Sequence, residues 1–219
     1  MMPVLDRVRF DARSIRACLV GGIIGAVAFV HPAVARAYDF KKIEAAIETL
    51  TPATQRNWEQ KAAGGDAIAQ NVTGMAYKYG IGVSQDHAAS MKWFRMAAEQ
   101  GEADAQFNLA RIHESKADGL YRRARAVPAN DGEAFKWYRL SAEQGHTQAQ
   151  VKLAEMYTQG GPPVPHDPVQ AHKWLSIAAS SGDETAAKRL ATYAAGMTPK
   201  QVREADSLAQ EWNSRHRSD

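Results

Sequence analysis

The sequence predicts an all-α fold, an α-solenoid of antiparallel helix pairs, because one stretch of it recurs twice. The segment KWFRMAAEQG at residues 92–101 returns as KWYRLSAEQG at 136–145 and as KWLSIAASSG at 173–182. In this register four alanines align with steps of 36, 44 and 37 residues: Ala69, Ala105, Ala149 and Ala186. A recurring unit of this length is typical of a helical repeat array. Within a unit, apolar residues stand three or four positions apart, as on one face of a helix.

The register divides the chain into three repeats with a capping segment at each end, since a stack of helix pairs must cover the apolar faces of its end units. We expect a signal peptide at 1–37, N-terminal capping helices at 38–65, repeat one at 66–101, repeat two at 102–145 with an eight-residue loop insertion, repeat three at 146–182, C-terminal capping helices at 183–213 with the last helix ending at about Trp212, and a tail at 214–219.

Each repeat is expected to contain a helix A, a loop and a helix B. Helix B ends at a glycine that can take the left-handed conformation of a C-terminal cap, and these glycines are Gly101, Gly145 and Gly182. An aspartate stands just before each helix B and is expected to accept its first backbone N–H groups; these aspartates are Asp86, Asp131 and Asp167.

Residues 1–37 have the pattern of an export signal. Arginines up to Arg16 precede an apolar run of 14 residues, 17–30, and the small residues Ala35 and Ala37 suit a signal peptidase. We therefore expect an exported, periplasmic protein whose signal is cleaved after Ala37. The alternative is an uncleaved membrane anchor, which would be the protein's only membrane contact.

The excess positive charge of the chain lies in this segment. Residues 1–37 hold five arginines and two aspartates, whereas the remaining 182 residues hold 22 basic and 22 acidic side chains. A neutral body has no electrostatic attraction to nucleic acid, so we expect no nucleic-acid partner. The one cysteine, Cys18, also lies in the signal, so the mature chain is expected to lack disulfides and cysteine-based metal sites.

The repeated tryptophans are interpreted as packing residues rather than as a ligand platform. Trp93, Trp137 and Trp174 occupy one register position, with small residues one turn later. A large side chain beside alanines is how close-packed helices interdigitate. Trp212 on the last helix receives the same interpretation.

The aligned motifs resemble those of the Sel-one-like (Sel1-like) repeat family, a branch of the tetratricopeptide superfamily. Repeat one contains Ala69-Gln70, Tyr77, Gly80-x-Gly82-Val83, Asp86, Trp93-Phe94 and Gln100-Gly101. Repeats two and three keep most of these positions, but repeat two loses the Gly-x-Gly-Val loop. The resemblance covers about residues 66–195. It implies an α-solenoid that displays a groove to other proteins and acts as an adaptor, without a reaction or a cofactor.

The sequence contains no motif for catalysis, a cofactor or a metal. It has no nucleophile elbow, no phosphate-binding glycine loop and no His-Glu-x-x-His run. We therefore expect neither an enzyme nor a metal site. His113 stands where repeats one and three have tyrosine; it either fills that place or titrates near pH 6 and loosens repeat two.

Candidate binding residues are those that depart from the repeat or lie off its packing face. The longest loop, 115–130, carries Tyr121, Arg122, Arg123 and Arg125, and arginine forks pair well with carboxylates or phosphates. A solvated loop without a partner is the alternative. On helix A, five residues are expected to line the concave side: Lys78, Asn108, Arg111, Lys152 and Glu155.

These expectations together predict an exported, monomeric scaffold that binds a protein or a peptide through its concave helix-A surface and the repeat-two loop. One alternative is a periplasmic regulator of a membrane sensor. Another is a hydrolase of cell-wall or β-lactam substrates, an activity attributed to cysteine-rich relatives, which is disfavoured because the mature chain has no cysteine.

Overall fold

A computed structural model describes residue 47, residues 50–114 and residues 129–217. The helices that it contains are α3 (Pro52–Ala63), α4 (Ala67–Tyr79), α5 (His87–Glu99), α6 (Ala103–His113), α8 (Asp131–Glu143), α9 (Thr147–Gln159), α10 (Pro168–Ser180), α11 (Glu184–Ala194) and α12 (Pro199–Arg217). We call α4, α6, α9 and α11 the A helices, and α5, α8, α10 and α12 the B helices. The predicted signal peptide, most of the first capping helix and the arginines of the repeat-two loop lie outside the described residues.

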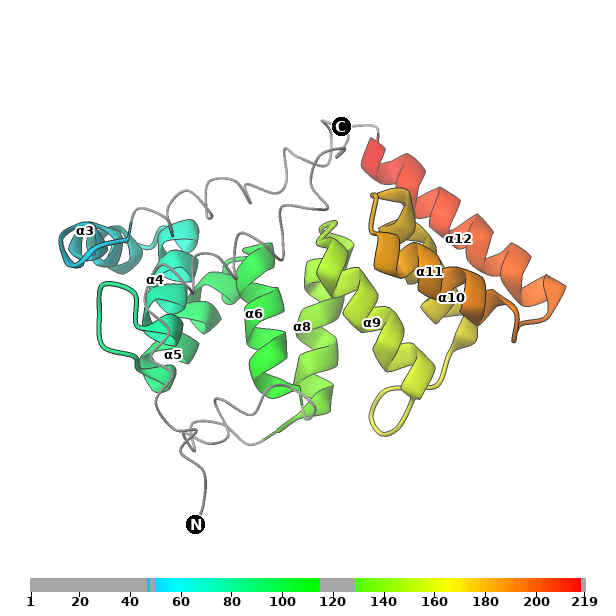
Figure 1. The fold of residues 1–219 in the computed structure, drawn as a ribbon, viewed down its shortest axis with the longest axis horizontal. Coiled ribbons are helices and arrows are strands. Elements are labelled where there is room, and N and C mark those ends of the chain that lie inside the picture. The colour runs from blue at the N-terminus through cyan, green and yellow to red at the C-terminus, as the bar shows by residue number, and fades with distance from the viewer. Residues whose placement is uncertain (1–46, 48–49, 115–128, 218–219) are drawn as a thin grey trace, which may run out of the picture.

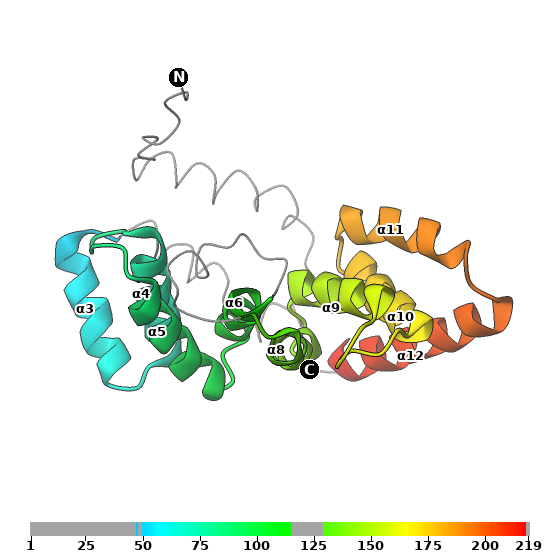
Figure 2. The ribbon, with the colours of Figure 1, turned by 90° about the horizontal axis from the view of Figure 1, so that it is seen from below.

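The helices follow one another along the long axis of the molecule, from α3 at one end to α12 at the other (Figure 1). Seen from below, the A helices form one layer and the B helices the other (Figure 2). Helices α6 and α9 each pack against their own B helix and against the B helix before it, and α4 packs against α5 and α3. The prediction of an all-α solenoid of helix pairs is therefore confirmed.

Glycines follow the B helices of the three repeats, and polar residues cap the A helices that come next. Gly101, Gly145 and Gly182 have φ of 91°, 91° and 93°, in the left-handed region that favours glycine. The next residue then caps helix A, as when the carboxylate of Asp183 accepts a bond of 2.7 Å from the N–H of Ala186. The sequence analysis did not predict these helix-A caps.

The helix-B caps correct one assignment. Asp86 and Asp167 cap α5 and α10, but the cap of α8 is Asn130, whose Oδ1 accepts from the N–H of Glu133 at 3.1 Å. Asp131 is the first helical residue instead. Helix α8 thus begins one residue earlier than the aspartate register predicts.

Buried glutamines connect successive helix pairs. The Gln106 side chain donates to the Ala98 carbonyl oxygen at 3.2 Å, which ties α6 to the preceding B helix. Its Oε1 in turn accepts from Gln144, at the end of α8, at 2.8 Å. Gln70 has the same two bonds, to the Ala62 carbonyl and from Gln100. Because α3 supplies that Ala62 carbonyl, it takes the place of a B helix.

Repeat three leaves this pattern incomplete. Gln150 donates to the Ala142 carbonyl at 3.2 Å, but its buried Oε1 has no hydrogen-bond partner in the described part of the chain. The reason is visible in the register, because Ser181 stands where the earlier repeats have Gln100 and Gln144. A serine side chain is too short to reach across.

Changing Ser181 to glutamine is therefore expected to stabilise the protein. The new amide would donate to the Oε1 of Gln150, and satisfying a buried acceptor contributes about 1 kcal/mol. Urea unfolding followed by circular dichroism measures the gain. As the reciprocal control, Gln144→Ser should cost about 1–3 kcal/mol by leaving the Gln106 acceptor without a donor. An unchanged stability in Ser181→Gln would contradict this explanation of the repeat-end glutamines.

The tryptophans differ in burial. Trp137 and Trp174 are 8% and 3% exposed, whereas Trp93 is only half-buried. The Trp174 ring meets Trp212 of α12 edge to face, with centroids 6.2 Å apart. The main core therefore extends from repeat one to the last helix.

The last helix is longer and packs differently than its register suggests. It continues to Arg217, past the expected end at Trp212, because the His216 ring stacks on Trp212 at 3.7 Å between centroids. A ring nitrogen of His216 also lies 3.1 Å from the Glu143 carbonyl oxygen. In addition, α12 packs mainly along α10 and makes little contact with α11. The last helix pair is thus splayed open.

Candidate protein-binding site

Two of the expected helix-A residues, Lys152 and Glu155, lie in the middle of a chain of ion pairs on the A helices. The ammonium of Lys152 is 3.3 Å from carboxylate oxygens of both Glu114 and Glu155. Glu155 is also paired with Arg189 of α11. Glu114, at the end of α6, accepts a bond of 2.8 Å from the Tyr138 hydroxyl. These ion pairs join three successive A helices.

The structure does not place the other expected residues in the same way. Lys78 is buried, 4% exposed, and its ammonium lies 4.9 Å from the centroid of the Tyr79 ring. Asn108 is also buried and donates to the Asn71 side chain of the neighbouring A helix at 3.3 Å. Arg111 is half-buried, with its guanidinium 5.9 Å from the Phe107 ring centroid. Of the residues expected to line the concave side, Lys78 and Asn108 are thus largely covered by neighbouring side chains.

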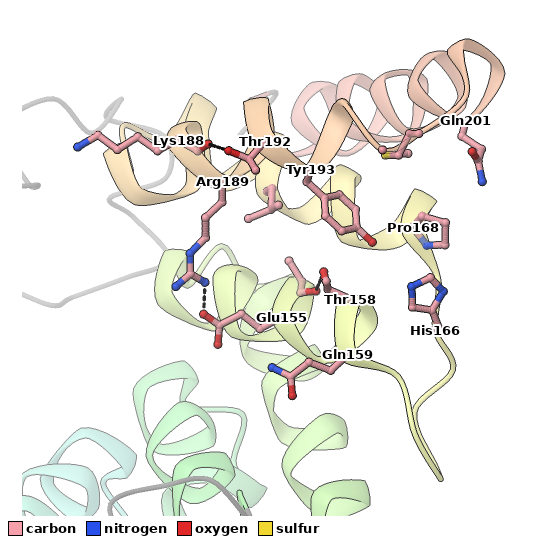
Figure 3. Close-up of a pocket in the computed structure, with 14 residues that line it drawn as sticks. Glu155, Thr158, Gln159, His166, Pro168, Lys188, Arg189, Thr192, Tyr193 and Gln201 are labelled. Carbon is pink, nitrogen blue, oxygen red and sulfur yellow. Dashed lines mark hydrogen bonds and ion pairs between the residues drawn. The ribbon is translucent and has the colours of Figure 1, made fainter.

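A cleft of about 720 Å³ opens between α9 and α11. Its walls come from both helices, the start of α10 and the turn into α12 (Figure 3). The lining residues are Ala154, Glu155, Thr158, Gln159, His166, Pro168, Leu175, Lys188, Arg189, Thr192, Tyr193, Gly196, Met197 and Gln201. Of the residues expected to bind, only Glu155 belongs to it. Figure 3 shows Tyr193 and Thr158 facing the space from opposite helices, and Lys188 pointing away from it.

The cleft exists because repeat three lacks a large aromatic side chain. Leu175 of α10 stands in the register of Phe94 and Tyr138, which are fully buried. In repeat one, the Phe94 ring lies so close to Gly74 that a Cβ at that position would be 2.7 Å from it.

The residues around those rings have counterparts in the cleft wall. Ala154 stands in the register of Gly74, and Thr158 in the register of Glu114, the acceptor of the Tyr138 hydroxyl. Thus Leu175, Ala154 and Thr158 surround a place that a ring fills in the earlier repeats. The sequence contains this signal in the residue that follows each repeated tryptophan, which is phenylalanine, then tyrosine, then leucine.

His113 is buried, and neither of its ring nitrogens has a hydrogen-bond partner within the described residues. Burial, and to a lesser degree the charge of Arg95, lower its pKa from the ordinary value of 6.5. The imidazole is therefore neutral at pH 7 and fills the place of the tyrosines. A group whose folded pKa is depressed contributes stability above its unfolded pKa, and this stability is lost as the pH falls below about 6.5.

We expect His113→Gln to reduce the acid sensitivity of folding. Between about pH 7.5 and about pH 5, the melting temperature of the wild type should fall further than that of the variant. The reason is that the imidazole of His113 binds a proton in the unfolded chain more readily than in the folded one, and glutamine binds none. Thermal melts at a series of pH values measure the difference. The matched control is His166→Gln, the same substitution at an exposed histidine. Parallel curves for wild type and His113→Gln would contradict the assignment.

Two other kinds of feature, a metal-binding cluster and a membrane-spanning helix, do not occur among the described residues. They contain no group of three or more histidine, cysteine, aspartate or glutamate side chains placed to hold a metal ion. None of the helices in these residues is long and apolar enough to cross a membrane.

Comparison with known proteins agrees with the repeat register. The family model described as Sel1 repeat matches residues 67–102, 103–146 and 147–183. Among solved structures, a protective antigen of uropathogenic Escherichia coli with an SLR fold is 30% identical, with a TM-score of 0.58, over 75% of this chain and 34% of the antigen. A Sel1 repeat protein from Oxalobacter formigenes is 27% identical, with a TM-score of 0.57, over 73% of this chain and 62% of that protein. The chain thus spans less than two thirds of either relative. No curated protein sequence matches it.

Proposed function

We propose that this chain, which belongs to the Sel1 repeat family, is a scaffold that binds a protein or a peptide through the surface of its A helices. Sel1 repeat proteins are in general scaffolds for protein–protein interactions and are typically not catalytic. The cleft between α9 and α11 is the observation that carries the choice of surface. It is concave and largely apolar inside, with polar groups at its edge, as binding sites usually are.

Contacts that hold the surrounding helices together support this proposal. The ion pairs of Lys152 and Glu155 hold α9 against its neighbouring A helices. Trp174 and Trp212 hold α10 against α12. A binding surface on such a frame is ordered before the partner arrives, so that little conformational entropy is lost on association.

We propose the repeat-two loop as a second contact. Arg122, Arg123 and Arg125 stand close together in the sequence and can pair with carboxylates on a partner. A partner that rests on the A helices and is also held by this loop would span repeats two and three.

The test of the proposed function is capture of partners from the cell envelope with the full chain as bait. We expect wild type to capture a defined set of proteins, and a variant with Arg122, Arg123 and Arg125 changed to glutamate to capture less of them. The matched control changes three exposed arginines of α3, α5 and α12 to glutamate: Arg56, Arg95 and Arg203. Equal capture by both variants would remove the loop from the proposal. A wild-type bait that captures nothing specific would overturn the scaffold function.

Export is the remaining part of the proposal. It is supported by the pattern of residues 1–37, with arginines before an apolar run and small residues at Ala35 and Ala37. We expect the chain recovered from the periplasm to begin at Tyr38 when its N-terminal residues are sequenced. Recovery of the chain from the cytoplasm with Met1 in place would contradict export.

A further inference from the structure

We propose that the cleft between α9 and α11 accepts an aromatic side chain of the partner, next to acidic residues. This inference rests on the proposed function and specifies the chemistry of the partner. The earlier repeats show the occupant that such a place takes. In repeat two, the Tyr138 ring is fully buried and its hydroxyl is 2.8 Å from Glu114; in repeat one, the place is filled by Phe94. In repeat three this register position is Leu175, which helps to line the cleft between two A helices.

The inside of the cleft suits an aromatic ring. Its floor is Leu175, 4% exposed, and Ala154, 1% exposed, and its walls include Pro168, Tyr193 and Met197. Rings stack favourably on the edge or face of tyrosine and on the sulfur of methionine. The volume of about 720 Å³ exceeds that of a single side chain, so one ring and part of its own backbone fit together.

The charges at the rim favour acidic neighbours in the partner. The one acidic residue of the lining, Glu155, is already held by Lys152 and Arg189. Lys188 is exposed and forms no ion pair in the part of the chain that the structure describes. Figure 3 shows its side chain extending beyond the cleft, toward the beginning of α11. A partner carboxylate that lies past the cleft, toward the beginning of α11, would meet this ammonium, whereas a basic residue there would be repelled.

The repeat pattern also provides a variant that closes the cleft. Changing Leu175 to tyrosine and Thr158 to glutamate restores the pair that repeat two uses, in which the tyrosine hydroxyl bonds the carboxylate. Since the same pair folds in repeat two, the double variant should melt at or above the wild-type temperature. The matched control is Leu175→Met, which keeps the volume and apolar character of the floor and leaves the cleft open.

The probe is the peptide acetyl-Glu-Glu-Phe-Glu-Glu-amide, titrated into the full chain and followed by nuclear magnetic resonance. We expect saturable binding at or below about 1 mM, with the largest shift changes at Leu175, Thr158 and Tyr193. The closed variant should weaken binding by about tenfold or more, and alanine in place of the phenylalanine should do the same. Leu175→Met should change the affinity by less than about threefold. Lys188→Glu should weaken the acidic peptide and strengthen one with lysines in place of the glutamates.

Three results would overturn the proposal. One is absence of saturable binding, and another is equal affinity in wild type and the closed variant. The third is that, in the wild type, the peptide shifts the signals of residues away from the cleft. This measurement tests binding in the cleft even if the closed variant does not fold. Partner capture separates this outcome from the scaffold function. If wild type and closed variant capture the same envelope proteins equally, the scaffold remains and only the aromatic site is wrong.

Discussion

Replacing Tyr138 with alanine is expected to lower the free energy of unfolding by about 3–5 kcal/mol, the range measured for large buried aromatic side chains. The Tyr138 ring has no exposed surface and lies 5.7 Å from the Phe107 ring of α6, centroid to centroid. Its removal leaves a cavity between α6 and α8, in the middle of the solenoid. It also takes the hydroxyl away from Glu114, the residue that holds Lys152 of the next repeat.

Urea unfolding monitored by circular dichroism measures this loss. Tyr138→Phe is the matched control, because it keeps the ring and removes only the hydroxyl; it should cost about 1 kcal/mol. A loss below about 1 kcal/mol in Tyr138→Ala would mean that the packing of repeat two does not depend on this ring. The absence of a ring at Leu175 would then not explain the cleft in repeat three.

Replacing Trp174 with alanine is expected to have a similar effect, about 3–5 kcal/mol, at the C-terminal end. Trp174 is 3% exposed, and its edge-to-face contact with Trp212 joins α10 to α12. Because α12 makes little contact with α11, the loss of this ring removes much of what holds the last helix in place.

The counterpart in repeat one provides a matched comparison. Trp93 is half-buried, so Trp93→Ala should cost distinctly less, about 1 kcal/mol. Denaturant unfolding of the two variants gives both values. In addition, amide exchange of α12 should accelerate in Trp174→Ala and not in Trp93→Ala, because only Trp174 touches that helix. Equal losses in the two variants would contradict the difference in burial.

The helices, and the glycines that follow helix B in each repeat, could be predicted from the sequence because they depend on local spacing. The register of Lys92–Gly101 gives the order of helices A and B, and the glycines at their ends need a conformation that few other residues adopt. The cap of α8 was assigned to Asp131 instead of Asn130, since two neighbouring residues can both accept a bond and only the path of the loop decides between them.

The candidate site could not be predicted in the same way, because it depends on contacts between repeats. The spacing places Lys78 and Asn108 off the packing face, yet Lys78 lies against the Tyr79 ring and Asn108 bonds Asn71 of the adjacent helix. The cleft results from leucine in place of an aromatic residue at position 175, and from the position of α12, which packs along α10 and not along α11. The first is visible in the aligned repeats, whereas the second depends on the Trp174–Trp212 contact.

The most direct test of the proposed binding surface is photo-crosslinking in the native envelope from two positions. A benzophenone side chain replaces Thr192, an exposed residue of α11 at the cleft, or Lys92, an exposed residue of the B helix α5. We predict that the position of Thr192 yields a defined crosslinked partner and that the position of Lys92 yields none. A partner crosslinked from Lys92 and absent from Thr192 would place binding on the B helices and contradict the proposed surface.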